Sequence, residues 1–200
     1  MTAAPALTLR SVILPRSGLL TDAVTVAAGV LLISLAAQFS IHLPFTPVPI
    51  TGQTFAVLLV GAGLGTVRGA LTGALYVLLP LAGLPLYADG AHGWSVLSGA
   101  SGGYLVAFPI AAALTGRLAE LRWDRSVGSA IGAMLTGNLI IYGIGVPWLA
   151  VSLHVSAQKA LEYGLYPFVA GDVLKLYLAA LALPVAWRLV GRTTRDRDAS

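Results

Sequence analysis

The chain is a succession of long apolar runs joined by short, more polar connections. The runs cover residues 19–41, 53–66, 69–83, 99–116, 127–150 and 167–190. A helix needs about 20 mostly apolar residues to cross the hydrocarbon core of a bilayer, so the second and third runs need flanking residues or a tilted neighbour. The pattern predicts an all-α, polytopic membrane protein with six transmembrane helices. Residues 19–190 form its membrane domain, between tails at 1–18 and 191–200.

Three connections on one side of the predicted bundle have distinctive compositions. Loop 42–50 contains three prolines, which exclude a regular helix, and it carries no acidic or basic residue apart from one histidine. Because the loop is so apolar, we expect it to pack back over the helices as a lid. Loop 84–98 is rich in glycine, and residues 151–164 form a short amphipathic segment. The candidate lid residues are Pro47, Val48, Pro49 and Ile50.

Basic residues fix the predicted orientation in the membrane. The chain has 12 lysines and arginines, and a six-helix count places ten of them on one side, whereas a count of five or seven would scatter them. The positive-inside rule then makes that side, with both termini, cytoplasmic. The ten are Arg10, Arg16, Arg68, Arg117, Arg122, Arg125, Arg188, Arg192, Arg195 and Arg197. The net charge of +4 is therefore a topological signal, and no nucleic-acid partner is predicted.

Composition supports the same class of protein. Hydrophobic residues make up 57% of the chain and charged residues 10%, against about 25% charged residues in an ordinary soluble domain. The mean hydropathy is +0.85. These values indicate an integral membrane protein. The absence of cysteine excludes a disulfide framework and a thiolate metal site.

Few motifs in the chain suggest catalysis. Residues 61–65 (GAGLG) lack the strand before them and the lysine after them that a phosphate-binding loop requires, so these glycines are predicted to pack helices. Three histidines, at 42, 92 and 154, fall in loops without the spacing of a metal site and are predicted to lie at the surface. No nucleophile motif appears. The sequence therefore predicts neither an enzyme, nor a metal site, nor a nucleotide cofactor.

The strongest candidate for function is a pair of charges within the last apolar run. Asp172 and Lys175 lie three residues apart, on the same side of a helix. Either charge alone would cost about 2.5–3.5 kcal/mol in the middle of a membrane helix. The pair either neutralises itself for helix packing or contacts a ligand, and ionisable groups inside a membrane favour the ligand.

Further polar residues are predicted at a similar depth. Gln53 follows the proline-rich loop, where its amide suits a urea or amide ligand but would also serve as a helix cap. Tyr104 follows two glycines, a pattern that fits helix packing as well as a binding site. Asn138 lies in the middle of the fifth run, where it contacts either a ligand or a neighbouring helix. Together with Asp172 and Lys175, these residues predict a small-molecule pocket open to the outside.

Six short motifs, in order along nearly the whole chain, resemble those of the BioY family. They are PVPITGQT (47–54), RGA (68–70), LAGLP (81–85), GGYL (102–105), GVPWL (145–149) and PFVAGDVLK (167–175). The resemblance implies a biotin-specific substrate-binding (S) component of an energy-coupling factor (ECF) transporter in a prokaryotic cell membrane. It also implies two kinds of partner, a transmembrane coupling subunit and a pair of cytoplasmic ATPases, which supply the energy because this chain binds no ATP.

The resemblance also implies roles for individual residues. It places biotin beneath the loop between the first two helices, with Asp172, Lys175 and Gln53 as contacts, and it places the coupling subunit against small residues of the first helix such as Ala23 and Ala27. A ureido ring fits such a site, because its N–H groups need an acceptor such as Asp172 and its carbonyl a donor such as Lys175 or Asn138. Val48, Ile50 and Tyr104 would cover the ring system.

Two alternatives remain open at the level of the sequence. A solitary biotin transporter, working without ATPases, would show the same motifs. A membrane-embedded enzyme or assembly subunit would use Asp172 and Lys175 for packing alone. Binding of biotin by the isolated chain separates the last alternative from the others.

Overall fold

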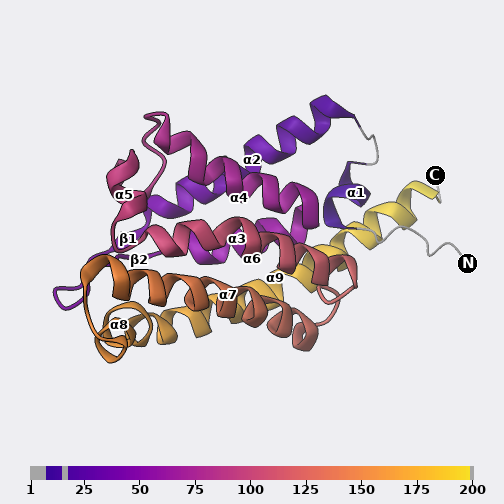
Figure 1. The fold of residues 1–200 in the computed structure, drawn as a ribbon. Helices are drawn as coiled ribbons and strands as arrows, with labels where there is room; N and C mark the ends of the chain where they lie inside the picture. Colours follow the sequence, from indigo (N-terminus) through magenta and orange to yellow (C-terminus); the bar gives the residue numbers. More distant parts are fainter. Residues whose placement is uncertain (1–7, 15–17, 199–200) are drawn as a thin grey trace, which may run out of the picture.

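The computed structural model describes residues 8–14 and 18–198, apart from the side chains of residue 180 and of residues 191–198. Six long helices form a bundle whose members run between the same two ends (Figure 1). They are α2 (Leu19–Gln38), α3 (Gln53–Leu64), α4 (Thr66–Leu81), α6 (Gly102–Glu120), α7 (Val127–Leu153) and α9 (Tyr166–Asp198). The prediction of a predominantly helical membrane protein is thus confirmed.

Four of these helices have the length and composition to cross a bilayer within the described part of the chain. They are Leu19–Gln38, Gly102–Glu120, Val127–Leu153 and Tyr166–Val190. The other two, α3 and α4, are apolar but have 12 and 16 residues. They are short because the chain turns at Gly65, the single residue between them, whose φ of +85° lies in the left-handed region. The count of six spans stays a prediction.

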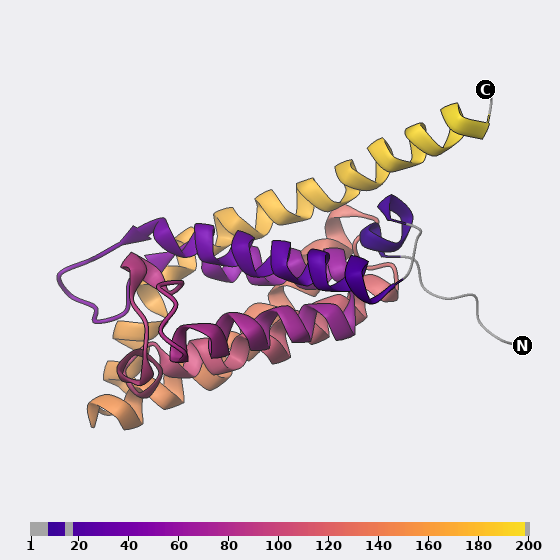
Figure 2. The same ribbon diagram turned by 90° about the horizontal axis from the view of Figure 1, so that it is seen from above.

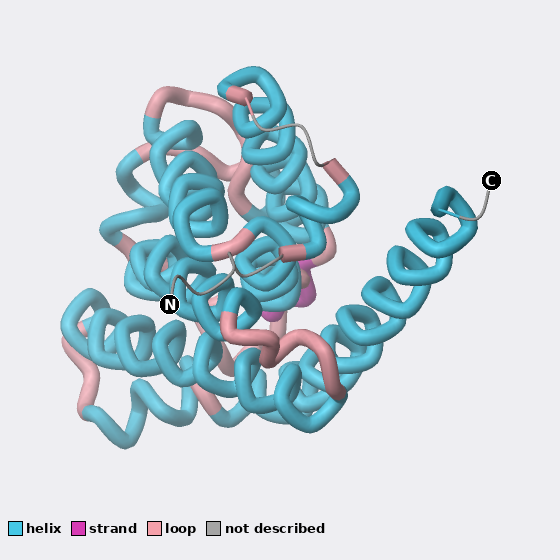
Figure 3. Tube along the Cα trace, turned by 90° about the vertical axis from the view of Figure 1, so that its right-hand side faces the viewer, coloured by secondary structure: helices cyan, strands magenta, loops and turns pink. Residues whose placement is uncertain are grey.

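Short elements close the two ends of the bundle. At one end lie β1 (Ser40–Ile41), β2 (Ile50–Thr51), α5 (Trp94–Ser98) and α8 (Ala157–Gly164), with the 3₁₀ turn η1 (Ala88–Gly90) between α4 and α5. At the other end lie α1 (Leu9–Ile13) and the α3–α4 and α6–α7 connections. The last turns of α9 extend beyond the bundle at this second end (Figures 2 and 3).

Several predicted boundaries are wrong by a few residues, and two of them have clear local reasons. The first apolar run is predicted helical through residue 41, but α2 ends at Gln38 because β1 pairs with β2, Ser40 opposite Thr51 and Ile41 opposite Ile50. The amphipathic segment 151–164 is also divided, since α7 continues to Leu153 and α8 begins at Ala157. The Ser156 side chain caps α8 by accepting a hydrogen bond from the backbone N–H of Lys159 (3.3 Å).

Helix α6 lies at the centre of the bundle and packs against α3, α4 and α7. Glycines allow this close approach. A Cβ at Gly61 of α3 would lie 2.4 Å from the carbonyl oxygen of Ala112 in α6, a distance that only a glycine permits. The prediction that these glycines pack helices is confirmed for Gly61, whereas a Cβ at Gly63 would meet no atom within 4 Å and Gly65 forms the turn between α3 and α4.

The end of the bundle that carries α1 also carries basic side chains. Arg10 of α1 and Arg68 of α4 both pair with Asp22 of α2, at 2.5 Å and 2.9 Å, so that one carboxylate joins three helices. Arg16 lies outside the described residues, and so do the side chains of Arg192, Arg195 and Arg197. Lys159 lies in α8, at the opposite end.

Candidate ligand-binding site

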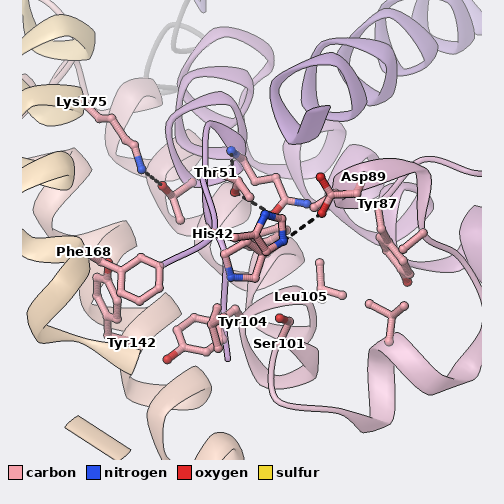
Figure 4. A pocket seen from close by; sticks show the side chains of 18 residues that line it. His42, Thr51, Tyr87, Asp89, Ser101, Tyr104, Leu105, Tyr142, Phe168 and Lys175 are labelled. Atoms are coloured by element: carbon pink, nitrogen blue, oxygen red, sulfur yellow. Dashed lines mark hydrogen bonds and ion pairs between the residues drawn. The ribbon is translucent and has the colours of Figure 1, made fainter. Parts of the chain in front are cut away.

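A cavity of about 240 Å³ lies at the end of the bundle closed by β1 and β2. Its walls come from the loop between α2 and α3, the loop between α4 and α6, and helices α3, α6, α7 and α9. Aliphatic and aromatic side chains make up much of the lining, and a few polar groups converge on the space (Figure 4). The polar side chains that line it belong to His42, Thr51, Gln53, Thr54, Tyr87, Asp89, Ser101, Tyr104, Tyr142 and Lys175.

The two intramembrane charges form an ion pair on α9. The Nζ of Lys175 lies 3.0 Å from Oδ1 of Asp172 and 3.4 Å from Oγ1 of Thr54, while the Tyr142 hydroxyl donates to Oδ2 of Asp172. Lys175 and Tyr142 line the cavity, whereas Asp172 is buried behind them with 4% of its surface exposed. The carboxylate is thus satisfied on both oxygens, and the charge of the lysine is balanced at the wall of the cavity.

Gln53 lines the cavity from the first position of α3, and its amide is held on both sides. Its Nε2 donates to the hydroxyl of Tyr76, and its Oε1 accepts from Oγ1 of Thr51 at 2.9 Å. The N-cap residue of α3 is Gly52, and the backbone N–H of Gln53 donates to Oγ1 of Thr51 at 3.3 Å. The amide of Gln53 is therefore oriented by the side chains of Thr51 and Tyr76, and its contact with a ligand stays a prediction.

Tyr104 forms one wall of the cavity. Its hydroxyl donates to the carbonyl oxygen of Gly164 at 2.8 Å, and its ring meets Tyr142 edge to face with centroids 6.2 Å apart. Gly145 of α7 leaves room for the ring, because a Cβ there would lie 2.4 Å from Cδ1 of Tyr104. The phenol is thus fixed by α7 and α8 and presents an apolar face to a ligand.

Two of the four lid residues line the cavity. These are Val48, which is 6% exposed, and Pro49; Pro47 and Ile50 are not among the lining residues. The lid is tied to α8, since Oγ1 of Thr46 donates to the carbonyl oxygen of Tyr163 at 2.6 Å. The proline-rich loop therefore covers the cavity from one side and is anchored to the end of α8.

Asn138 lies apart from the other predicted site residues. It lines a separate space of about 10 Å³, shared with Thr54 and Lys175. Its Oδ1 is buried and has no hydrogen-bond partner within the described part of the chain. Asn138 therefore lines a small space that shares two residues, Thr54 and Lys175, with the cavity.

Several residues that line the cavity are not among the site residues predicted from the sequence. His42, predicted to be a surface histidine, lies 3.1 Å through Nε2 from Oδ2 of Asp89, and both line the cavity. Tyr87 is 1% exposed and donates to the carbonyl oxygen of Val77 at 2.7 Å; burial raises its pKa to about 12, so the phenol stays neutral. The sequence indicates these residues only indirectly, because it predicts loops 42–50 and 84–98 on the same side of the helical bundle.

The fold and the cavity together define a class of protein. Apolar helices of membrane-spanning length surround a lidded pocket whose walls are mainly apolar and whose polar groups are few and oriented. This arrangement is that of a membrane-embedded binding protein for a small molecule.

Comparison with known proteins identifies the family. The family model described as the BioY family matches residues 7–192, and the chain therefore belongs to the BioY family. A probable biotin transporter BioY of Pyrococcus horikoshii is 38% identical over 84% of this chain and 95% of its own length. The biotin transporter BioY of Thermotoga maritima is also 38% identical, over 78% of this chain and 90% of its own length.

A solved structure shares the fold. The crystal structure of the S-component for biotin from an ECF-type ABC transporter superposes on this chain with a TM-score of 0.76. The two chains are 25% identical, and the match covers 84% of this chain and 92% of the other. The helical arrangement described above is thus shared with a solved S-component for biotin.

Proposed function

We propose that this protein binds biotin inside the membrane and serves as the S component of an ECF-type ABC transporter, a transport protein and not an enzyme. The observation that carries the proposal is the lidded cavity with the Lys175–Asp172 pair at its buried wall, in a chain of the BioY family. Relatives named as biotin transporters and the solved biotin S-component support the choice of ligand.

The chemistry of biotin suits the proposed site. Biotin has a neutral ureido group, an apolar thioether ring and a carboxylate on a flexible tail. In this proposal Lys175 donates to the ureido carbonyl, and Asp172 accepts a ureido N–H in place of the Tyr142 hydroxyl. Tyr104, Val48 and Pro49 cover the ring system. Gln53 supplies an oriented amide, and Asn138 supports Lys175 from behind.

The same proposal includes the arrangement of the chain in a prokaryotic plasma membrane. The six long helices span the bilayer with both termini cytoplasmic, residues 19–190 form the membrane domain, and residues 1–18 and 191–200 are the tails. The basic side chains at the α1 end of the bundle support this orientation. The cavity then opens toward the outside, and α3 and α4 reach their full span through flanking residues.

The partners in this proposal are a transmembrane coupling subunit and two cytoplasmic ATPases. Ala23 and Ala27, both exposed on α2, offer the coupling subunit a surface of small side chains. The ATPases supply the energy for inward delivery of biotin. A BioY protein that transports biotin alone is the alternative, and uptake measured with and without the coupling subunit and ATPases distinguishes the two.

Equilibrium binding tests the core of the proposal. The full chain is purified in detergent and titrated with radiolabelled biotin, with excess unlabelled biotin as the competitor. We expect saturable binding with one site per chain. Absence of saturable binding by folded protein would overturn the proposal. Uptake of biotin by cells that contain this chain but lack the coupling subunit and ATPases would instead favour the solitary transporter.

A further inference from the structure

A second polar pair lies at the exposed side of the cavity, away from Lys175. His42 follows β1, and its Nε2 lies 3.1 Å from Oδ2 of Asp89 in η1. The side chains of His42 and Asp89 are 64% and 51% exposed, compared with 20% for Lys175 and 6% for Asp172. Figure 4 shows Lys175 and Asp89 on opposite sides of the pocket. The cavity therefore has one buried polar wall and one solvent-accessible polar wall.

The fold holds Asp89 in position. Its Oδ1 accepts a hydrogen bond from Oγ of Ser40 at 2.5 Å. Its backbone has a φ of +57°, which a residue other than glycine seldom adopts. Gln38 secures the surrounding turn, because its Nε2 donates to the carbonyl oxygen of Tyr87 (3.0 Å) and its Oε1 accepts from the N–H of Gly90 (3.1 Å). The carboxylate that faces His42 is thus fixed by contacts from α2 and β1.

The two walls suit different parts of a ligand. At the buried wall, the charge of Lys175 is already balanced by Asp172, so this wall matches a neutral polar group. A ligand carboxylate placed there would lose its hydration, because the side chains of this wall are 20% and 6% exposed. At the exposed wall a carboxylate keeps contact with water. The anionic tail of a ligand whose neutral head lies against Lys175 therefore belongs near His42.

The protonation state of His42 then determines how the carboxylate is bound. With Nε2 directed at Asp89, the remaining ring nitrogen is Nδ1, for which the described residues provide no partner. A neutral imidazole has only one N–H, whereas the imidazolium donates from both nitrogens. Only the protonated ring can serve Asp89 and a ligand carboxylate together, and its positive charge offsets both anions.

We propose that His42, held by Asp89, receives the carboxylate of the bound ligand, and that binding of this anion is linked to the uptake of one proton from water by the imidazole. The inference rests on the proposed function, because it takes biotin as the ligand and assigns its tail to a subsite. The other titratable groups lining the cavity are Tyr87, Asp89, Tyr104, Tyr142 and Lys175, with Asp172 behind them. Of these side-chain types and histidine, only histidine ordinarily changes charge between about pH 5 and 8.

The test compares biotin with biotinamide, in which a neutral amide replaces the carboxylate. Equilibrium dissociation constants are measured at pH 6 and pH 8 for the detergent-purified wild type, His42→Gln and His92→Gln. His92 is the matched control, since it is exposed in the loop next to η1 and does not line the cavity. One linked proton changes affinity by at most about tenfold per pH unit. We expect the wild type and H92Q to bind biotin about tenfold more weakly at pH 8 than at pH 6.

The expected pattern for the amide and for H42Q is different. Biotinamide should show no such dependence on pH, and H42Q should bind biotin at both pH values as the wild type does at pH 8. Undiminished binding of biotinamide by H42Q demonstrates that the variant is folded. A wild-type protein that binds both ligands without dependence on pH, or an H42Q variant that keeps the wild-type dependence, overturns this inference and leaves the proposed function standing. A wild type that binds neither ligand overturns both.

Discussion

The ammonium group of Lys175 lies 3.0 Å from the carboxylate of Asp172, one turn earlier on α9, and only the lysine lines the cavity. Replacing Asp172 by asparagine leaves that cation without its counter-charge at the wall of the binding site. Removal of one partner from a buried ion pair is strongly unfavourable. We expect D172N to weaken biotin binding at least about tenfold, the equivalent of about 1.4 kcal/mol, measured by equilibrium binding in detergent.

An exposed pair with the same spacing provides the matched control. Lys159 and Glu162 of α8 also lie three residues apart, with Nζ and Oε2 separated by 2.8 Å, but their side chains are 46% and 40% exposed. Ion pairs between exposed side chains contribute little to stability. Glu162→Gln should leave biotin affinity unchanged. If D172N also retains wild-type affinity, Asp172 has only a packing role.

The lid yields a kinetic prediction. Prolines 47 and 49 restrict the chain that carries Val48 over the cavity, while Thr46 anchors it to α8. Replacing both prolines by glycine increases the conformational entropy of the open loop. This change favours the open over the closed loop by about 0.4–1 kcal/mol for each site. We expect biotin to dissociate about fivefold faster from the double variant, measured by chase with unlabelled biotin.

A proline outside the cavity serves as the comparison for the lid. Pro85 is exposed and is not among the lining residues. Pro85→Gly should dissociate biotin at the wild-type rate. A double lid variant with an unchanged dissociation rate would show that loop 42–50 is a connector and does not retain the ligand.

How far the sequence could predict the site depends on the range over which its residues interact. The Asp172–Lys175 pair follows from helical spacing, since residues three apart share one side of a helix. Gln53 and Tyr104 follow from their similar predicted depth in the second and fourth apolar runs. The contact between His42 and Asp89 joins two loops 47 residues apart in number, and no periodicity relates them.

For Asn138 the sequence predicts burial but not which cavity the side chain lines. A polar residue in the middle of an apolar run predicts an inward-facing side chain, and Asn138 is indeed buried. Periodicity does not say which of two adjacent cavities the side chain enters. That choice depends on the rotation of α7 against α9, which is set by packing. The fold class was therefore accessible from hydrophobic patterning, whereas the grouping of side chains around the ligand required tertiary structure.

Close packing of α6 against α7 leads to a prediction about stability. A Cβ at Gly103 would lie 2.2 Å from the Cβ of Trp148, so alanine there forces the two helices apart. Overpacking of this kind typically costs 1–3 kcal/mol. We expect Gly103→Ala to lower the apparent melting temperature in detergent by about 2–10 °C at a fixed scan rate.

The control for Gly103 lies on the facing helix. A Cβ at Gly143 of α7 would meet no atom within 4 Å. Gly143→Ala should leave the melting temperature unchanged or raise it slightly, because alanine is the better helix former. Equal effects of the two substitutions would contradict the role of Gly103 in helix approach.

A buried carboxylate at the opposite end of the bundle predicts a dependence of stability on pH. Asp124, in the α6–α7 connection, is 1% exposed; the Nε1–H of Trp187 donates to its Oδ2 at 2.5 Å, and Arg125 stacks 3.2 Å from the centre of the Trp187 ring. Loss of hydration raises the pKa of Asp124 above its usual value, despite the hydrogen bond from Trp187 and the charge of Arg125.

The raised pKa determines the sign of the effect. The folded protein binds the Asp124 proton more tightly than the unfolded chain does, so this group stabilises the fold below its unfolded pKa and loses that contribution as pH rises through the folded pKa. Asparagine cannot ionise, so in the variant this position makes no pH-dependent contribution to stability. We therefore expect the melting temperature of Asp124→Asn, relative to the wild type, to increase from about pH 4 to about pH 7.

Glu162 should behave in the opposite way, which makes it the control for Asp124. The hydrogen bond from Lys159 lowers the pKa of Glu162, so its contribution to stability is present above the unfolded pKa and is lost as pH falls. The melting temperature of E162Q, relative to the wild type, should therefore decrease slightly over the same rise in pH, the effect being small because the pair is exposed. If D124N and E162Q shift in the same direction, or if D124N shows no trend with pH, burial does not govern the ionisation of Asp124.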